Sequence, residues 1–304
     1  MALTQHRVRF DFEIAFSNGG QLQGHGFRLD IEGDDIADDA LSDALVRDLR
    51  LLMVGTVRVF HKEIITEPHK RNRPAADRYR LVDLSHEIEN GMVTYRGLPA
   101  PIVCDYVSRE ASRRRFRLAP GVEFHIGRID MVANTGTYVD SPFHRFADGA
   151  DLGALPLERL ANLASIVVPA PYAEGRAITR ARLGDFDASG KAILVRTGWD
   201  AHWRTDRYFA GHPFLTADAA QWLADCGAAL VGIDSLNIDD AKDGDRPVHS
   251  RLLGAGIPIV EHLRGLSQLP PAGFRFTAVP AKVRAFGSFP VRAYAELGNG
   301  ANAP

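Results

Sequence analysis

A carboxylate and an imidazole lie close together in residues 134–144, which read NTGTYVDSPFH. Asp140 and His144 flank Pro142, whose ring fixes one backbone torsion, and Gly136 supplies a position that tolerates a tight turn. A backbone so restricted holds both side chains in a defined place. An imidazole and a carboxylate held together can bind a divalent ion or transfer protons, so this segment is the first candidate site.

A second pair of such residues follows in RPVHSRLLGAGIPIVEHL. His249 opens a predicted helix, and Glu261 ends the apolar strand that comes after it. Because consecutive elements joined by a short loop usually lie side by side, Glu261 can return close to His249. With Asp140 and His144, the chain offers two histidines and two carboxylates, which suits a divalent metal ion or acid–base catalysis.

Apolar segments typical of buried strands precede these polar groups. AILVRTGW, AALVGID and GIPIVE are such runs, TADAAQWLADC predicts a helix capped at Thr216, and PLERLANLASIVVPA predicts a helix leading to a strand. Strand ends and the loops after them carry the chemistry of α/β enzymes. Residues 79–304 are therefore predicted to form one α/β domain with a buried, mixed sheet.

The first 67 residues have a pattern of their own. Apolar side chains alternate with polar ones at Val8, Phe10, Phe12, Ile14 and Phe16, which predicts a half-buried strand. Two further strands and one helix complete a small ββαβ module at 1–67, and the polar, proline-containing stretch at 68–78 predicts a linker. The module has no cluster of acids and histidines, so we expect it to pack on the second domain or mediate assembly.

The composition limits the partners of the chain. The net charge of its 304 residues is −2 at pH 7, which is not that of a polyanion binder, so we expect no nucleic-acid partner. No stretch approaches the roughly 18 consecutive apolar residues of a membrane span. Two distant cysteines exclude a zinc ribbon and a disulfide framework. We therefore expect a cytoplasmic protein with a small-molecule substrate.

Several common catalytic motifs do not occur in the sequence. Without GxSxG, a Walker loop, GxGxxG or HExxH, a serine hydrolase, a nucleotide enzyme and a zincin are unsupported. The arginine-rich stretch REASRRRFR at 109–117 has two interpretations. It is either a solvated face or the source of an arginine that reaches the site and pairs with a substrate carboxylate.

Residues 80 to about 296 resemble the cyclase family, which contains bacterial kynurenine formamidase and isatin hydrolase. The resemblance rests on five motifs in order: VDLSHEIENGMVTYRGLPAP, TGTYVDSPFHRFADGADLGALPLERL, AILVRTGWDAHW, LVGIDSLNID and HSRLLGAGIPIVEHLRGL. It implies a swivelling β/β/α fold, generally a homo-oligomer, that hydrolyses amide or cyclic amide bonds with a bound divalent metal.

The same resemblance implies roles for individual residues. The family's loop reads His-x-Gly-Thr-His-x-Asp-x-Pro-x-His, so Asp140 corresponds to its metal-ligand aspartate and His144 to its catalytic histidine. His249 and Glu261 correspond to the distal pair that holds a second metal in zinc formamidases. The family's two ligand histidines are replaced here by Asn134 and Tyr138.

These two replacements change the expected ion. Asn134 offers only a carbonyl oxygen, and Tyr138 offers a phenol that must lose a proton whose ordinary pKa is about 10. An oxygen-rich set of Asn134, Tyr138 and Asp140 favours a harder ion such as manganese over zinc. Alternatively, the ion moves toward Asp140, His249 and Glu261. The predicted cofactor is a divalent ion, zinc or manganese.

The leading hypothesis is a metal-dependent hydrolase of a small amide, cyclic amide or imide, or lactone. Water activated by the ion attacks the carbonyl, Asp140 anchors the ion, and His144 passes the proton to the leaving atom. Two alternatives stay open. A degenerate, metal-free family member would be a small-molecule binding or regulatory protein, and a metal-free isomerase or ring-opening enzyme would use Asp140 and His144 alone and survive chelation.

Overall fold

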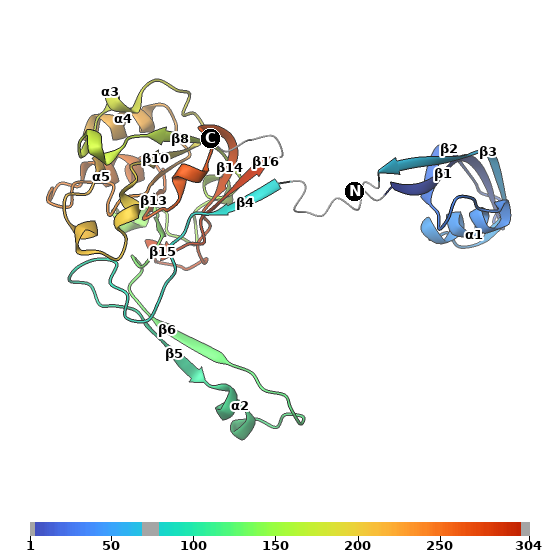
Figure 1. Ribbon diagram of the computed structural model, residues 1–304, viewed down its shortest axis with the longest axis horizontal. Helices are drawn as coiled ribbons and strands as arrows, with labels where there is room; N and C mark the ends of the chain where they lie inside the picture. Colours follow the sequence, from blue (N-terminus) through green and yellow to red (C-terminus); the bar gives the residue numbers. More distant parts are fainter. Residues whose placement is uncertain (1–3, 69–78, 299–304) are drawn as a thin grey trace. The chain divides into compact units, whose positions relative to one another are not determined.

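The computed structural model describes residues 4–68 and 79–298, and the chain divides into two compact units, residues 1–78 and 79–304 (Figure 1). The linker predicted at 68–78 lies, except for Pro68, outside the described residues. No helix in the described ranges is long and apolar enough to cross a membrane.

The first unit is a three-stranded antiparallel sheet with one helix. Its elements are β1 (Thr4–Phe16), β2 (Gln21–Asp30), α1 (Asp38–Asp48) and β3 (Val54–Pro68), and β1 is the middle strand. The predicted ββαβ order is therefore observed. Its core consists of the inward side chains of β1 packed with those of α1: Val8, Phe10, Phe12, Ile14, Leu41 and Leu45. The alternation in the sequence is thus the alternation of buried and outward side chains along β1.

The described part of the second unit contains one mixed sheet of nine strands. In spatial order these are β15 (Ser288–Pro290), β7 (Tyr138–Asp140), β13 (Ile259–Glu261), β12 (Leu230–Ile233), β10 (Ala192–Arg196), β8 (Leu163–Pro169), β14 (Ala272–Thr277), β16 (Tyr294–Gly298) and β4 (Tyr79–Asp83). The strands β13, β12, β10 and β8 run parallel, and the strands on both sides pair antiparallel. The mixed sheet predicted from the sequence is confirmed.

Both faces of this sheet are buried, which explains the continuous apolar runs. Along β10, Ala192 and Leu194 join one core cluster, whereas Ile193 and Val195 join another. Successive strand residues point to opposite faces, so the two clusters lie on opposite sides of the sheet. The second cluster also contains the inward faces of α4 (Ala217–Asp225) and α5 (Pro247–Gly254), which follow the predicted helix-then-strand order.

The prediction of a helix in PLERLANLAS is wrong. Only a single 3₁₀ turn forms at Leu157–Arg159, and β8 begins at Leu163. Asn162 adopts a left-handed backbone conformation, with φ of 54°, which ends the turn and redirects the chain into the strand. A two-residue parallel pair, β9 (Ala177–Ile178) and β11 (Phe214–Leu215), and the short helix α3 (Arg180–Leu183) complete the body of the unit.

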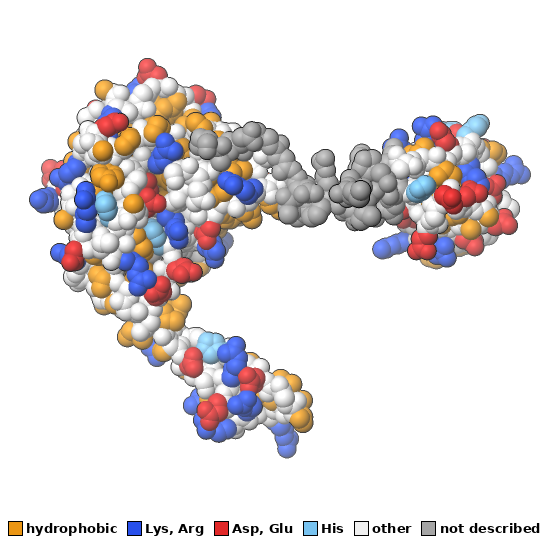
Figure 2. Space-filling model, in the orientation of Figure 1, with side chains coloured by type: hydrophobic (Ala, Val, Ile, Leu, Met, Phe, Trp, Pro, Cys, Tyr) orange, Lys and Arg blue, Asp and Glu red, His pale blue; other side chains and the backbone are white. Residues whose placement is uncertain are grey.

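A hairpin carries the arginine-rich stretch. It comprises β5 (Ile102–Val107), α2 (Arg109–Arg115) and β6 (Ile126–Asp130), and its two strands pair only with each other among the described strands (Figure 1). Every residue of β6 is exposed, and arginines and apolar side chains share the surface of the hairpin (Figure 2). Arg113 and Arg114 pair with Glu123 and Glu110. The arginines of this helix therefore form a solvated face, as one of the two interpretations expects.

Candidate metal and catalytic site

Strand pairing at one edge of the sheet brings three distant segments together. The strand β7 lies between β13 and β15, with Asp140 opposite Ser288 and Tyr138 opposite Glu261. Side chains at paired positions of neighbouring strands lie on the same face. Strand register therefore brings Asp140 into contact with Ser288, 148 residues away in the sequence, and Tyr138 into contact with Glu261, 123 residues away.

The turn after β7 presents His144 beside Asp140. Pro142–His144 forms one 3₁₀ turn, and two glycines pack against it. A Cβ added to Gly287 would lie 2.6 Å from His144 Cα, and one added to Gly149 would lie 2.6 Å from the carbonyl carbon of Pro142. No side chain fits at such distances, so only glycine at these two positions allows the turn to sit where it does.

Ser288 connects the two polar residues of the loop. Its hydroxyl donates a hydrogen bond to Asp140 Oδ1 and lies 2.9 Å from His144 Nδ1. A hydroxyl has one proton, so once it donates to the carboxylate it accepts from a protonated Nδ1. His144 then carries its free lone pair on Nε2. Ser288 therefore selects the tautomer of His144 that can bind an ion or accept a proton.

Asp239 orients the second histidine in the same way. Its carboxylate accepts hydrogen bonds from the backbone N–H groups of Val248 and His249, at 2.7 and 3.0 Å, and lies 2.6 Å from His249 Nδ1. The Nε2 atom then faces Asp140 Oδ2 at 3.7 Å and Glu261 Oε1 at 3.8 Å. Burial lowers the pKa of His249, but the surrounding carboxylates outweigh burial and raise it to about 10.

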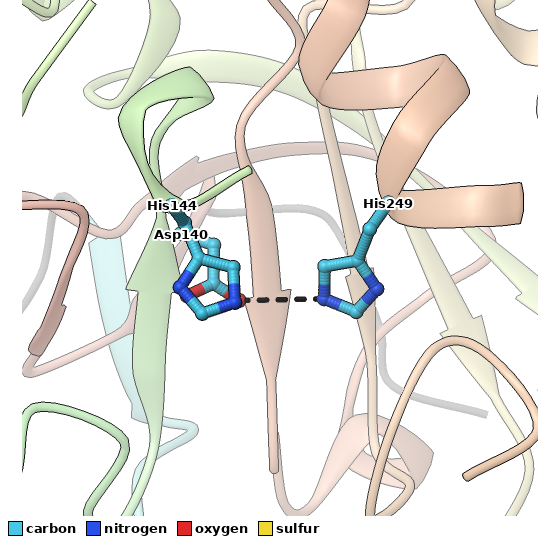
Figure 3. A group of neighbouring side chains, drawn as sticks. All are labelled: Asp140, His144 and His249. Atoms are coloured by element: carbon cyan, nitrogen blue, oxygen red, sulfur yellow. Dashed lines mark ion pairs between the residues drawn. The ribbon is translucent and has the colours of Figure 1, made fainter. Parts of the chain in front are cut away.

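Three of the predicted residues form a cluster that fits a divalent ion. One ligand atom from each of Asp140, His144 and His249 lies within 4.8 Å of the other two (Figure 3). Asp140 Oδ2 is buried and has no hydrogen-bond partner among the described residues. Histidines that bind an ion through one ring nitrogen while the other is hydrogen-bonded to a neighbouring residue, together with a carboxylate, are typical ligands of zinc and manganese.

Glu261 lies beside this cluster and is bound to Tyr138. Its Oε1 accepts a hydrogen bond of 2.6 Å from the backbone N–H of Ile238, and its Oε2 accepts one from the Tyr138 hydroxyl. Burial raises the pKa of Glu261 to about 7, and burial with the charge of Glu261 raises the pKa of Tyr138 well above its ordinary value. Tyr138 is thus a neutral donor to Glu261, and its role as a metal ligand stays a prediction.

Five of the six predicted site residues line one cavity of about 420 Å³. His144, His249 and Glu261 form part of its wall together with Tyr138 and Asn134. Within the described residues, the side chain of Asn134 makes no hydrogen bond, so its carbonyl oxygen is available to a ligand. All the predicted site residues except Asp140 therefore line this cavity, and the buried Asp140 lies 3.6 Å from His144 Nδ1 and 3.7 Å from His249 Nε2.

Sequence reasoning missed several residues that complete the site. Asp239 lies in GIDSLNID, a segment recognised as polar and strand-ending, so a signal for it was present. The same segment contains Asn237, whereas Ser288 and Tyr95 gave no such signal. Tyr95 accepts a hydrogen bond of 2.8 Å from the Asn237 amide and approaches Glu261 at 3.5 Å, contacts that only the folded chain creates.

Comparisons with known proteins agree on the family. The cyclase family model matches residues 82–240. A kynurenine formamidase of Bacillus cereus is 25% identical over 214 residues, covering 70% of this chain and 95% of that protein. A kynurenine formamidase of Salinibacter ruber is 31% identical over 170 residues, covering 56% of this chain and 78% of that protein.

Solved structures show the same fold. Isatin hydrolase A from Labrenzia aggregata superposes with a TM-score of 0.61 at 21% identity, covering 73% of this chain and 94% of that one. A structure described as a predicted metal-dependent hydrolase from Bacillus stearothermophilus has a TM-score of 0.55 at 26% identity, covering 72% and 98%.

The fold and site define an α/β protein with a carboxylate–histidine centre at the edge of a mixed sheet. More specifically, the chain belongs to the cyclase family. The predicted family and its swivelling β/β/α fold, preceded by a small α+β module, are confirmed.

Proposed function

We propose that this protein is a metal-dependent hydrolase of a small amide, cyclic amide or imide, or lactone. The observation that carries the proposal is the cluster of Asp140, His144 and His249. Each histidine has its Nδ1 held by a neighbour, and the buried Oδ2 of Asp140 accepts no hydrogen bond from the described residues. Relatives named kynurenine formamidase and isatin hydrolase support the choice of reaction class.

Within this proposal, the three residues differ in role because they differ in exposure. The side chains of Asp140 and His249 are 0% and 6% exposed, whereas that of His144 is 36% exposed. Asp140 and His249 are the ligands, with Glu261 adjacent, and a divalent ion bound there would supply Lewis-acid activation of water and of the carbonyl. His144 exchanges protons more readily because solvent reaches it.

The proton path follows from the tautomer of His144. Its Nε2 lone pair accepts a proton as the oxygen of water bonds to the carbonyl carbon. The carbon–nitrogen or carbon–oxygen bond then breaks, and His144 returns the proton to the leaving atom. Ser288 and Asp140 stabilise the imidazolium that forms between these two steps, since both lie on the Nδ1 side.

Chelation tests the proposal directly. Protein purified without chelators would be assayed for metal content and for hydrolysis of a panel of formamides, cyclic imides and lactones. We expect stoichiometric ion, loss of turnover on chelation, restoration by zinc or manganese, and loss of both ion and turnover in Asp140→Asn. Turnover that survives chelation would instead favour the metal-free enzyme. Ligand binding without ion or turnover would favour the binding protein.

A further inference from the structure

Groups of both charges lie at the cavity. Glu261 is fully buried in its lining and Asp140 is fully buried beside the lining histidines, whereas two arginines of the lining, Arg145 and Arg246, are respectively exposed and half-buried. Arg145 follows His144 directly, and Arg246 precedes His249 by three residues. Each histidine of the centre therefore has an arginine close by on the solvent side of the same cavity.

Both arginines have only neutral partners among the described residues. Arg246 donates to the amide oxygen of Asn237 at 2.9 Å, and Arg145 donates to the hydroxyl of Ser250 at 3.1 Å and the carbonyl of Asp245 at 3.3 Å. A guanidinium has five N–H groups and keeps its charge. Each arginine therefore retains unused donors and an uncompensated positive charge at the cavity.

This lack of ion pairs sets them apart from the third arginine of the cavity lining. Arg96 pairs with Asp206 at 2.5 Å, so its charge is compensated.

The backbone at Arg246 is also unusual. It has φ of 48° and ψ of 57°, a left-handed conformation at the residue that precedes α5. Glycine or asparagine adopts this conformation more readily than arginine. Strained positions of this kind gather at ligand-binding sites, where the side chain matters more than the local backbone energy.

We propose that Arg246, with Arg145, binds a carboxylate of the substrate, so that the enzyme acts on amides or cyclic amides that carry a carboxylate. This inference rests on the proposed function. A guanidinium binds a planar carboxylate through two parallel hydrogen bonds, and a neutral analogue leaves the guanidinium unpaired. The carboxylate then fixes the distance between the outer cavity and the scissile bond above Asp140.

Matched substrate pairs test this inference. The 2-, 3- and 4-formamidobenzoates would each be compared with the corresponding formamidobenzamide, which differs only in replacing the carboxylate by an amide. We expect kcat/KM to favour one carboxylate over its amide by roughly 10- to 100-fold, as hydrogen bonds to charged groups do. Arg246→Gln should remove most of this preference. Arg246→Lys should remove only part of it, because lysine keeps the positive charge but cannot donate two parallel hydrogen bonds to the carboxylate.

Arg251→Gln is the matched control, since Arg251 is an exposed arginine of α5, the helix that Arg246 precedes, and lies outside the cavity lining. It should keep the full preference. Equal turnover of acid and amide by the wild type, or a preference unchanged by Arg246→Gln, would overturn the inference while leaving the hydrolase intact.

If none of the formamidobenzoates or formamidobenzamides is hydrolysed, a binding measurement still tests the arginine site independently of the proposed hydrolase function. Calorimetric titration of chelator-treated protein with the aminobenzoates and aminobenzamides removes any contribution of an ion to carboxylate binding. Tighter binding of a carboxylate that weakens about tenfold in Arg246→Gln would support the arginine site even if the proposed function failed. Equal binding of acid and amide would refute it.

Discussion

The substitution Asp239→Asn tests whether a residue outside the cavity wall controls metal binding. Asp239 accepts hydrogen bonds from two backbone N–H groups of α5 and holds His249 Nδ1 at 2.6 Å. Asparagine has one acceptor oxygen, which can still cap the helix, but its NH₂ group then faces Nδ1. That contact favours the tautomer with the proton on Nε2, where it blocks an ion.

The expected loss is about 10- to 100-fold in metal affinity, the usual effect of removing such an orienting partner, or roughly 1.4 to 2.7 kcal/mol. Folding should lose roughly 1 to 3 kcal/mol, because asparagine can still accept a hydrogen bond from the helix but no longer pairs with the buried, charged His249. Zinc affinity would be measured by competition with a chromogenic chelator, and stability by urea unfolding of the metal-free protein.

Asp240→Asn is a suitable control because Asp240 lies in the same loop and pairs with Arg176 at 3.3 Å instead of with a histidine. It should bind zinc as the wild type does. If Asp239→Asn also binds zinc as tightly as the wild type, His249 is not the oriented ligand that we describe.

Four further predictions follow from the same geometry. Ser288→Ala should lower turnover by about 10- to 100-fold, because it removes the hydroxyl that holds the proton of His144 on Nδ1. Ser141→Ala is the control: it removes only a hydrogen bond to the Gly287 carbonyl and should have a much smaller effect on the rate. The double change Asn134→His with Tyr138→His should raise zinc affinity by more than tenfold in calorimetry, and unchanged affinity would count against the equivalence of these positions with ligand histidines. Burial raises the pKa of Asp234 from 3.8 to about 7, so between these two pH values the folded state binds more protons than the unfolded state, and the free energy of unfolding falls as pH rises. Asp234→Asn should reduce this fall, measured by urea unfolding at a series of pH values. An unchanged pH dependence of the free energy of unfolding would show that Asp234 is not its source. Deleting residues 1–78 should change the number of subunits, measured by light scattering, or the solubility. Loss of turnover in a folded protein with an unchanged number of subunits would show that the module contributes to catalysis.

Long periodic segments were the part of the fold that the sequence could predict. The alternation in β1 and the helix-then-strand order of α4, β12, α5 and β13 are all local patterns, and the structure confirms each of them. The strands β7 and β15 have three residues each, too few to show a period. The helix predicted before β8 failed because the left-handed turn at Asn162 outweighed an apparently helical pattern.

The residues of the candidate site also fall into those that the sequence could identify and those that it could not. Asp140, His144, His249 and Glu261 could be chosen from residue type and position, and the structure gathers them at one cavity. Ser288 could not, because its contact with Asp140 depends on the register of β15 against β7. Of the two interpretations of residues 109–117, the solvated face is the one observed, since that stretch forms the exposed helix of the hairpin, whereas the arginines that line the cavity are Arg96, Arg145 and Arg246.

The two glycines packed against the turn, Gly149 and Gly287, have a consequence for directed evolution of this protein. A methyl group at Gly287 or Gly149 carries no charge and no hydrogen bond, yet it would overlap the backbone that positions His144 and displace the turn. Asn134, by contrast, makes no hydrogen bond within the described residues and is open to replacement. Mutant libraries that aim at new substrates or ions should therefore vary the polar wall of the cavity and keep these two positions fixed. The capacity of the site to acquire new chemistry depends on two residues that have no side chain.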